Sequence, residues 1–331
     1  MHRVYVREGH EGTAGAWSLH FRFVPLSWTD EIDEILGGDL AAAFAHLTPA
    51  KGVVVTPMAP LGLRDRKAGT VTVTTAIALH KKLAAVRRDP KVAVVYHARE
   101  HSLTDRPEFV VVQGRGLFPE QPDREWLESI TPQWERFLGP RAGGLAGAWM
   151  SNYYWVRVPI VIEVERIISL PSAFSDASAT VHGSPRPPDP EPQTRPSKGV
   201  EPRVGTERVA ADARRLPHSV LSWAGGDGYP AAAEIRVESV EPEGLRISAA
   251  PGLLPLGGRR AGLTSHLFEK RMHGQEQRIH TGWLEVDESG GTYSPHTRGG
   301  YKLPASQPAF TLACGIVRAR KRGARKAGFN A

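Results

Sequence analysis

Short runs of apolar, β-branched residues recur along the chain, separated by clusters of glycine, proline and charge. In residues 70–75 valine and threonine alternate, and a period of two is typical of a strand with one buried face. The pattern therefore predicts a strand-dominated protein. The expected strands span residues 52–60, 69–76, 91–98, 108–118 and 153–168 in the first half, and residues 218–223, 231–240, 244–250, 280–286 and 290–304 in the second half.

Helical patterns are few. The first expected helix covers residues 29–47, where Thr29 can cap, acids fill the first turn and Ile32, Ile35 and Leu36 recur at helical spacing. A second helix is expected from about Ala76, and it must end before Pro90 because the residue preceding a proline disfavours helical geometry.

The second half contains one helix candidate, which starts at Arg259 and stops at Gly274. Its inward face would carry Leu263, Leu267 and Met272. Within the same stretch, Arg259 and Arg260 are expected to form a solvated pair rather than a phosphate contact. Glycine-rich turns at 225–228 and 290–291 favour hairpins, because such turns need positive φ.

A segment crowded with proline, serine and charge divides the chain. It covers residues 172–207 and has the composition of a linker. The chain therefore divides into a first domain of residues 1–171, this linker, a second domain of residues 208–316 and a basic tail of residues 317–331. The expected fold class is mainly β with few helices, as two antiparallel β-barrel-like domains in tandem.

The net charge of +7 comes from 42 Lys+Arg against 35 Asp+Glu, and at first it suggests a polyanionic partner. However, six of the basic residues lie in the acid-free tail, which leaves the rest of the chain near +1. No nucleic acid is therefore expected on the folded body. The six tail residues are Arg318, Arg320, Lys321, Arg322, Arg325 and Lys326.

The only cysteine is Cys314, so an internal disulfide and a cysteine-built zinc site are excluded, and a small buried residue is expected there. The polar start lacks a signal peptide, and no apolar run is long enough to span a membrane. A cytoplasmic protein is the expectation.

The 13 histidines show no metal-binding spacing. Five in the second half are interpreted as surface or hydrogen-bonding residues, with a haem ligand among them left open: His218, His266, His273, His280 and His296.

Positive charge gathers at the start of the second expected helix. His80, Lys81 and Lys82 lie in or near its first turn, where the helix dipole is already positive. With the hydroxyls of Thr74 and Thr75 and free backbone N–H groups alongside, this arrangement suits a phosphate. The alternative is two lysines on a solvent-exposed face. By contrast, cations in the last turn complement the dipole, which gives Arg87 and Arg88 a structural role.

The order of these pieces resembles the pyridoxamine 5'-phosphate oxidase-like, flavin-binding split β-barrel family. The resemblance covers about residues 38 to 170. It rests on a strand with Val55, Thr56, Pro57 and Met58, a strand ending in Thr74 and Thr75, a basic helix running into Asp89, Pro90 and Val92, and a strand with Val112, Gln113 and Gly114. The sequence departs from the family pattern at Ala85, where asparagine is usual, and at His80, where serine is common.

The resemblance implies FMN, or the deazaflavin F420, as cofactor. It places the phosphate on Lys81, Lys82 and the Thr74 and Thr75 hydroxyls, and the ring against the strand of Val55, Thr56 and Pro57. Gln113 joins the implied cofactor-binding residues. No catalytic residue and no metal ligand is identified. Four aromatic residues are candidates either to flank the ring or to pack in the core: Trp149, Tyr153, Tyr154 and Trp155.

Members of this family are usually homodimers with the cofactor between two barrels, so a tandem chain is expected to form an internal pseudo-dimer or a homodimer.

Three functions remain open. The first is a flavin- or F420-dependent oxidoreductase acting on an unidentified small molecule, and absence of a catalytic triad is expected for it because the flavin supplies the hydride chemistry. The second is a flavin- or haem-binding protein without turnover. The third is a nucleic-acid-associated protein that uses residues 317–331.

Overall fold

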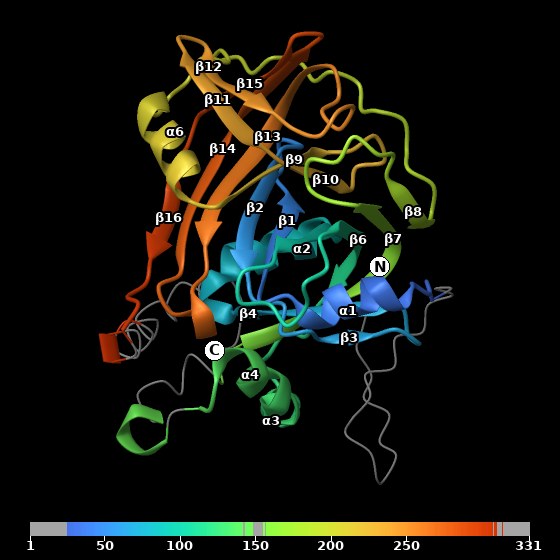
Figure 1. Ribbon diagram of the computed structural model, residues 1–331, viewed down its shortest axis with the longest axis vertical. Coiled ribbons are helices and arrows are strands. Elements are labelled where there is room, and N and C mark those ends of the chain that lie inside the picture. The colour runs from blue at the N-terminus through green and yellow to red at the C-terminus, as the bar shows by residue number, and fades with distance from the viewer. Residues whose placement is uncertain are drawn as a thin grey trace.

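The computed structural model describes residues 25–141, 143–147, 155, 157–306, 308–309 and 313. Two eight-stranded antiparallel sheets dominate it, as Figure 1 shows, with the second sheet above the first. The chain is thus mainly β, with two split β-barrel domains in tandem, as the alternating pattern predicts. Cys314, Trp149, Tyr153, Tyr154 and the basic tail lie outside the described residues.

The first sheet has the strand order β2-β1-β5-β6-β7-β4-β3, with β8 paired to β7. Helices α2, α3 and α4 and the 3-10 turn η1 lie between its strands, and α1 precedes them. The elements are α1 (Asp30–Gly38), β1 (Ala41–Leu47), β2 (Val53–Met58), β3 (Arg64–Asp65), β4 (Thr70–Ala76), η1 (Ile77–Leu79), α2 (His80–Arg88), β5 (Lys91–Ala98), β6 (Phe109–Leu117), α3 (Arg124–Ser129), α4 (Thr131–Leu138), β7 (Arg157–Leu170) and β8 (Thr180–Gly183).

The second sheet has the order β10-β9-β13-β14-β15-β12-β11, with β16 paired to β14. Adding eight to each strand number of the first sheet reproduces this order, so the second half repeats the topology of the first. Its elements are α6 (Thr206–Arg215), β9 (His218–Ala224), β10 (Pro230–Glu234), β11 (Arg236–Glu241), β12 (Gly244–Ser248), β13 (Gly257–Leu267), η2 (Lys270–Met272), β14 (Glu276–Asp287), β15 (Gly290–Pro295) and β16 (Gly299–Lys302).

The repeat differs at one place that matters for function. In the first half η1 and α2 connect β4 to β5, whereas the equivalent connection in the second half, residues 249–256, contains no helix. Proline and glycine in that connection, such as Pro251 and Gly252, explain the difference because neither residue favours a helix interior.

The two halves meet along a seam in which each contributes its first hairpin. Strand β2 packs against β13 and β14, and β10 packs against β5 and β6. Two apolar clusters mix residues of both halves. One of them includes Ala45, Val55 and Val95 from the first half and Val220 from the second. Two further clusters fill the barrel interiors separately. In Figure 1, β1 and β2 rise from the first sheet toward the strands of the second.

The expected helix over residues 29–47 is only half right. Helix α1 ends at Gly38, and Ala41–Leu47 forms strand β1. Every residue of β1 is buried, because this strand lies between β2 and β5 and packs on both faces. Burial on both faces overrides the helical propensity of an alanine-rich stretch.

The helix expected from Arg259 is wrong, since Gly257–Leu267 is the strand β13, paired on both sides to β9 and β14. The expectation of a solvated arginine pair is wrong as well. Arg259 is 1% exposed and donates hydrogen bonds to the carbonyl oxygens of Pro190 and Leu256. Gly274 does have positive φ, of 62°, and ends the turn η2 rather than a helix.

The proline-rich segment connects the halves and also contacts both. It contributes β8, which extends the first sheet. Gln193 donates from Nε2 to the Lys51 carbonyl in the first half, at 3.0 Å, and accepts from the Arg260 backbone N–H in the second half, at 3.1 Å. Among the described residues no helix is both long enough and apolar enough to cross a membrane.

Candidate functional site

Positive side chains gather at the start of helix α2, which follows the 3-10 turn η1 directly. The helix begins at His80, its N-cap residue Leu79 makes no side-chain capping bond, and its first turn contains no acid. The first N–H groups of any helix lack an intrahelical partner and carry the positive end of the dipole. His80, Lys81 and Lys82 thus occupy the first turn, as the sequence predicts, and the turn as a whole favours an anion.

Lys82 is the half-buried cation of this site. Its Nζ lies 5.3 Å from the ring centroid of Phe44, which β1 supplies. Burial, together with the charge of Arg157, lowers the pKa of Lys82 to about 8. No ion pair among the described residues includes Lys82, so an anion would relieve the cost of burying its ammonium. Lys81, the neighbouring residue, is exposed.

Arg157 adds a second cation that the local motif does not contain. It is the first residue of β7 and lies opposite Ala76 in the register with β4. Its Nε donates to the Thr74 hydroxyl at 3.0 Å and its second terminal nitrogen to the Thr74 carbonyl at 3.1 Å. The guanidinium also stacks on Trp134 of α4, 5.2 Å from the ring centroid. The strand end and α4 thus hold Arg157 in place.

The two threonines of β4 play different parts. Successive side chains of a strand point to opposite faces, so Thr74 and Thr75 do not face the same side. Thr74 binds Arg157, whereas the Thr75 hydroxyl, on a residue 3% exposed, has no hydrogen-bond partner. The hydroxyl of Thr56 on β2 is likewise buried without a partner. Because buried hydroxyls nearly always find partners, these two oxygens indicate a missing ligand or water.

His46 is a further residue of this region that the sequence does not single out. It lies on the same face of β1 as Phe44, with ring centroids 6.2 Å apart, and its Nδ1 is buried without a partner. Burial, followed by the charges of Lys82 and Arg88, lowers its pKa to about 4. The imidazole is therefore neutral near pH 7. His80 also has a buried Nδ1 without a partner.

The remaining predicted residues lie on the seam instead. Val55 is fully buried in the mixed apolar cluster, and Pro57 is buried opposite Ala43. Gln113 is 3% exposed, and both ends of its amide are used: Oε1 accepts from Arg166 and Nε2 donates to the Pro230 carbonyl. Thr74, Thr75, Lys81 and Lys82 thus lie at the start of α2 or in the strand that leads into it. Thr56 lies opposite Phe44 in the register of β1 and β2, whereas Val55, Pro57 and Gln113 lie on the seam.

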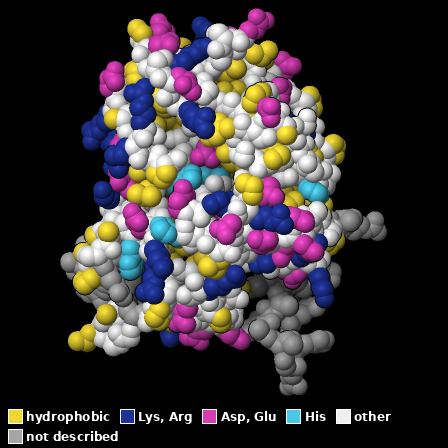
Figure 2. Space-filling view, viewed as in Figure 1, with side chains coloured by type: hydrophobic (Ala, Val, Ile, Leu, Met, Phe, Trp, Pro, Cys, Tyr) yellow, Lys and Arg dark blue, Asp and Glu magenta, His cyan; other side chains and the backbone are white. Residues whose placement is uncertain are grey.

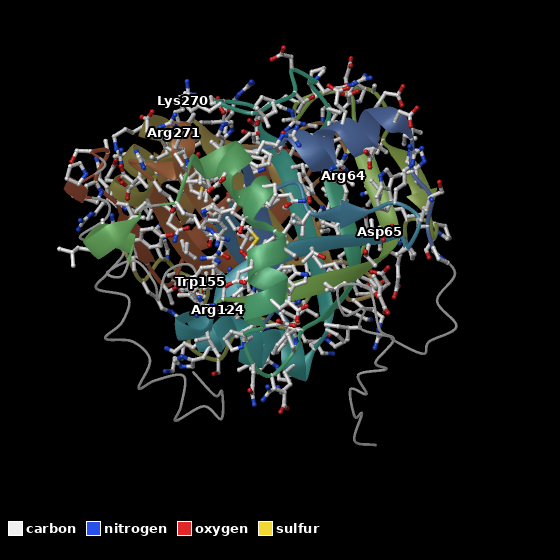
Figure 3. All side chains as sticks on the ribbon, turned by 90° about the horizontal axis from the view of Figure 1, so that it is seen from below. Arg64, Asp65, Arg124, Trp155, Lys270 and Arg271 are labelled. Carbon is white, nitrogen blue, oxygen red and sulfur yellow. The ribbon has the colours of Figure 1, made fainter. Side chains whose placement is uncertain are left out.

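Other predicted side chains have structural partners. Trp155 lies between two guanidinium groups, those of Arg124 at 4.9 Å and Arg141 at 4.5 Å, and packs beside the apolar cluster under α3 and α4. Figure 3 shows Trp155 beside Arg124. Arg88 donates to the Leu47 carbonyl at 2.7 Å, and Arg87 stacks on Phe118, which agrees with the structural role expected for both.

Hydrogen bonds engage His218, His266, His280 and His296, as expected, but two of these histidines are not at the surface. His266 is 0% exposed and His280 is 1% exposed. His280 and His296 bind backbone carbonyls, and His218 binds two carboxylates. The described residues contain no group of three histidine, cysteine or acidic side chains arranged to hold a metal ion.

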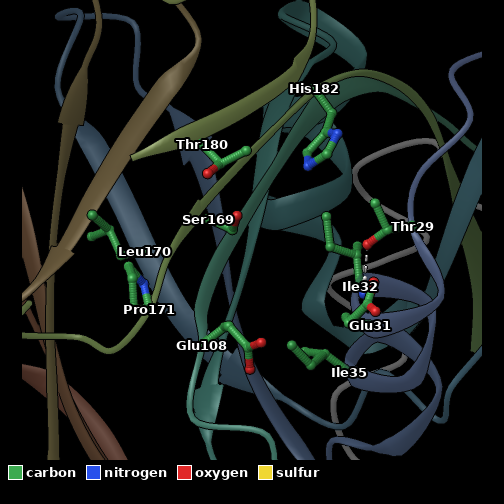
Figure 4. Close-up of a pocket in the computed structure, with 10 residues that line it drawn as sticks. All are labelled: Thr29, Glu31, Ile32, Ile35, Glu108, Ser169, Leu170, Pro171, Thr180 and His182. Carbon is green, nitrogen blue, oxygen red and sulfur yellow. Dashed lines mark hydrogen bonds between the residues drawn. The ribbon is translucent and has the colours of Figure 1, made fainter. Parts of the chain in front are cut away.

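A cavity of about 290 Å³ lies elsewhere, between the start of α1, the end of β7 and β8. Glu31, Glu108 and His182 contribute its polar groups, and Ile32 and Ile35 its apolar wall, as Figure 4 shows. None of the predicted cofactor-binding residues lines this cavity.

No family model matches the chain, and no curated protein matches it. Solved structures resemble parts of it. A conserved hypothetical protein from Mycobacterium tuberculosis is 22% identical, with 44% of this chain and 85% of its own covered and a TM-score of 0.34. A putative pyridoxamine 5'-phosphate oxidase from Listeria innocua is 20% identical, with 43% and 98% covered and a TM-score of 0.30. A pyridoxamine 5'-phosphate oxidase-related, FMN-binding protein from Nostoc punctiforme is 7% identical, with 60% and 87% covered and a TM-score of 0.27.

Two of these similar structures thus carry the name of the family that the sequence resembles. Their TM-scores are low, so the likeness decides nothing about ligand or reaction in this chain. Strand order and register define the fold, and the contacts at the start of α2 define the candidate site.

Proposed function

We propose that this protein binds a phosphorylated flavin-type cofactor, FMN or F420, at the start of α2 and uses it for oxidoreduction of a small molecule. The observation that carries the proposal is the environment of Lys82. In the described part of the chain, the half-buried ammonium of Lys82 has no carboxylate partner and lies in the first turn of α2, near the charge of Arg157. The strand that leads into this turn ends close to the partnerless hydroxyl of Thr75.

The residues present fit a phosphate group. Lys82 supplies a charge whose burial an anion would offset, and the first-turn N–H groups supply donors. The Thr75 hydroxyl can donate as well, since no residue in the described part of the chain accepts from it. Arg157 adds positive potential from β7 while its own hydrogen bonds keep it beside Thr74.

When bound, such a cofactor supplies the hydride chemistry through its ring. The chain's own residues would bind the phosphate and orient the ring, and the neutral His46 would leave the positive charge to Lys82 and Arg157.

The proposal assigns one site to each chain. The second half repeats the strand order but has no helix between β12 and β13, so it offers no equivalent of the α2 N-terminus. The two halves would then form an internal pseudo-dimer, in which the second barrel covers the seam of the first rather than binding a cofactor of its own.

Equilibrium titration tests the proposal most directly. FMN, F420 and riboflavin, which lacks the phosphate, are added to the purified protein, and binding is followed by fluorescence quenching. We expect FMN or F420 to saturate one site per chain and riboflavin to bind at least about tenfold more weakly, because a charge-assisted contact contributes about 1.5 to 3 kcal/mol. Equal affinity for FMN and riboflavin, or no binding of either phosphorylated compound, would contradict the proposal.

Turnover is tested separately. The cofactor-loaded protein is mixed with NADPH or dithionite and then with acceptors, and the flavin absorbance is followed. Reduction and reoxidation through several cycles supports an oxidoreductase. Stable binding without any cycling supports the alternative of a flavin-binding protein without turnover, and a Soret band in the purified protein would instead indicate haem.

A further inference from the structure

Three histidines from both halves of the chain meet at the seam. His97 lies near the end of β5, His218 begins β9 and His266 lies near the end of β13. Their ring centroids are 5.0 to 5.4 Å apart. Because β13 is the counterpart of β5 in the repeat, His97 and His266 occupy similar places in the two halves. Figure 2 shows histidine side chains at mid-height, where the two halves join.

The His97 and His266 rings point their Nε2 atoms at each other, 2.8 Å apart. His97 Nδ1 lies 3.1 Å from the Val95 carbonyl, which can only accept, so this nitrogen carries the proton. His97 Nε2 is then the acceptor, and His266 Nε2 donates to it. His266 Nδ1 is left as a lone pair, and it is buried without a partner. A single proton between the two facing Nε2 atoms is therefore enough to form the hydrogen bond.

A further proton has no stable place on the pair. On His97 it would turn the acceptor Nε2 into a donor, and His266 could accept from it only by moving its own proton to Nδ1, where no group accepts it. On His266 it would create a buried N–H at Nδ1 with nothing to accept from it. Burial and the neighbouring His218 accordingly lower the pKa of His97 to about 4, and burial lowers that of His266 well below its usual value.

The third histidine holds the positive charge of the cluster. His218 donates to Glu100 at 2.5 Å and to Glu234 at 3.2 Å. Burial alone would lower its pKa, but the hydrogen bonds to both carboxylates raise it to about 9. A charged imidazole between two carboxylates therefore lies beside a neutral pair, and its charge further disfavours protonation of that pair.

The other groups around the pair do not offset a second charge. Arg99 and Asp39 form an ion pair at 2.5 Å, and they couple weakly to His97 and His218, respectively. Phe109 on β6 and Phe268 after β13 cover the rings with apolar surface. On β14, the uncharged Gln277 lies opposite His266 in the register. Glu100 and Glu234 are already engaged by His218.

We propose that the His97–His266 pair is a proton-operated latch between the two halves of the chain. It holds β5 against β13 while both imidazoles are neutral, and one additional proton releases it. The released seam would free β2 and β10, since each of these strands packs on the opposite half.

Hydrogen exchange measured by mass spectrometry tests the latch. Protection of the β2 and β10 peptides, corrected for intrinsic exchange, is followed from about pH 7 to about pH 4 while far-UV circular dichroism reports whether the sheets persist. We expect protection of both peptides to fall by up to about tenfold per pH unit from about pH 6.5, the pKa of a free imidazole, down to about pH 4, the pKa of His97 in the closed seam, with the circular dichroism unchanged.

The variant His266→Gln separates the latch from other effects of acid. A glutamine amide can donate to His97 Nε2, or turn over and accept from it once it is protonated, so the hydrogen bond survives in both states. We expect this variant to keep its seam protected down to the pH of global unfolding. The matched control is His280→Gln, which removes another buried histidine, in the second barrel, and should open its seam as the unchanged protein does.

Two results would overturn the proposal: a seam that opens at the same pH in His266→Gln and in the unchanged protein, or a seam that stays closed in the unchanged protein until the sheets unfold. If His266→Gln fails to fold, the ¹⁵N shifts of the histidine rings in the unchanged protein decide the matter. The latch requires His97 and His266 to remain neutral until the seam opens. Titration of either ring with the seam still protected rules the latch out.

Discussion

Arg166 donates from Nε to the side-chain oxygen of Gln113 at 2.7 Å, and the same glutamine donates to the Pro230 carbonyl of the other half at 2.7 Å. Arg166 also binds the Pro185 carbonyl and the Asp227 carboxylate. A residue that the sequence motif assigns to the cofactor thus fastens the first sheet to the hairpin turn of the second.

Replacing Gln113 with leucine should weaken the fold rather than the cofactor site. The change leaves the Pro230 carbonyl and one donor of Arg166 without partners in a buried place, which costs about 2 to 4 kcal/mol. Chemical denaturation measures the loss of unfolding free energy, and Gln121→Leu, at an exposed position, is the control. If the folded Gln113→Leu variant loses FMN affinity without losing stability, Gln113 is a ligand after all.

Lys82 and Lys81 form a matched pair at the start of α2. Lys82→Gln should weaken FMN binding by about 10- to 100-fold, because it removes the half-buried charge that the proposal assigns to the phosphate. Lys81→Gln removes an exposed charge from the same turn and should weaken binding by no more than about threefold. Fluorescence titration gives both values, and equal effects of the two changes would place the phosphate elsewhere.

Arg157→Lys tests the second cation of the site. Lysine keeps the charge but cannot form both bonds to Thr74, nor stack as a plane on Trp134. We expect FMN affinity to fall by roughly tenfold with the thermal midpoint nearly unchanged. Arg136→Lys, on α4 itself, is the control. An FMN affinity that does not change in Arg157→Lys would remove this residue from the site.

Gly262 on β13 allows the closest backbone approach between the halves. A Cβ built there would lie 2.4 Å from the Val53 carbonyl of β2. Gly262→Ala should therefore push β2 away and lower the unfolding free energy by about 1 to 3 kcal/mol, as overpacking does. Gly205→Ala, where a Cβ meets nothing within 4 Å, should change stability little. Denaturation midpoints compare the two, and similar losses in both would argue against a tight seam at Gly262.

His218 should make stability depend on pH in alkaline solution. Its pKa is raised to about 9 in the folded protein, so its stabilising effect is fully present below the unfolded value of about 6.5 and is lost as the pH rises through 9. The difference in unfolding free energy between the unchanged protein and His218→Gln should thus shrink by about 3 kcal/mol over that range. A difference that stays constant from about pH 6 to about pH 10 would show that His218 is not charged in the folded state.

Most strands were predictable because their patterns are local. Residues 91–98 coincide with β5, alternation located β4, and a short β-rich run located β6. The pattern failed at Ala41–Leu47, where an alanine-rich run forms a central strand, since burial on both faces removes the alternation by which a strand is read. It failed again at β13, where Leu263 and Leu267 happen to follow a helical spacing.

Only those residues of the candidate site that lie in one continuous segment of the chain were predictable from the sequence. Lys82 and Thr75 lie close together in the sequence, so their proximity follows from a strand that leads into a helix. Arg157 and Trp134 reach the same place from β7 and α4, and no local signal connects them to Thr74. The pairing of His97 with His266 depends on how the two halves dock, which no pattern within either half contains.

The first hairpin of each half packs against the other half, and this arrangement has a consequence for folding during synthesis. Strands β1 and β2 are synthesised well before β13 and β14, so the apolar side of β2 stays in water until the rest of the chain emerges. Because the two halves belong to one chain, their association is intramolecular, and dilution of the protein does not weaken it. A protein built from two separate copies would face that penalty each time its concentration fell.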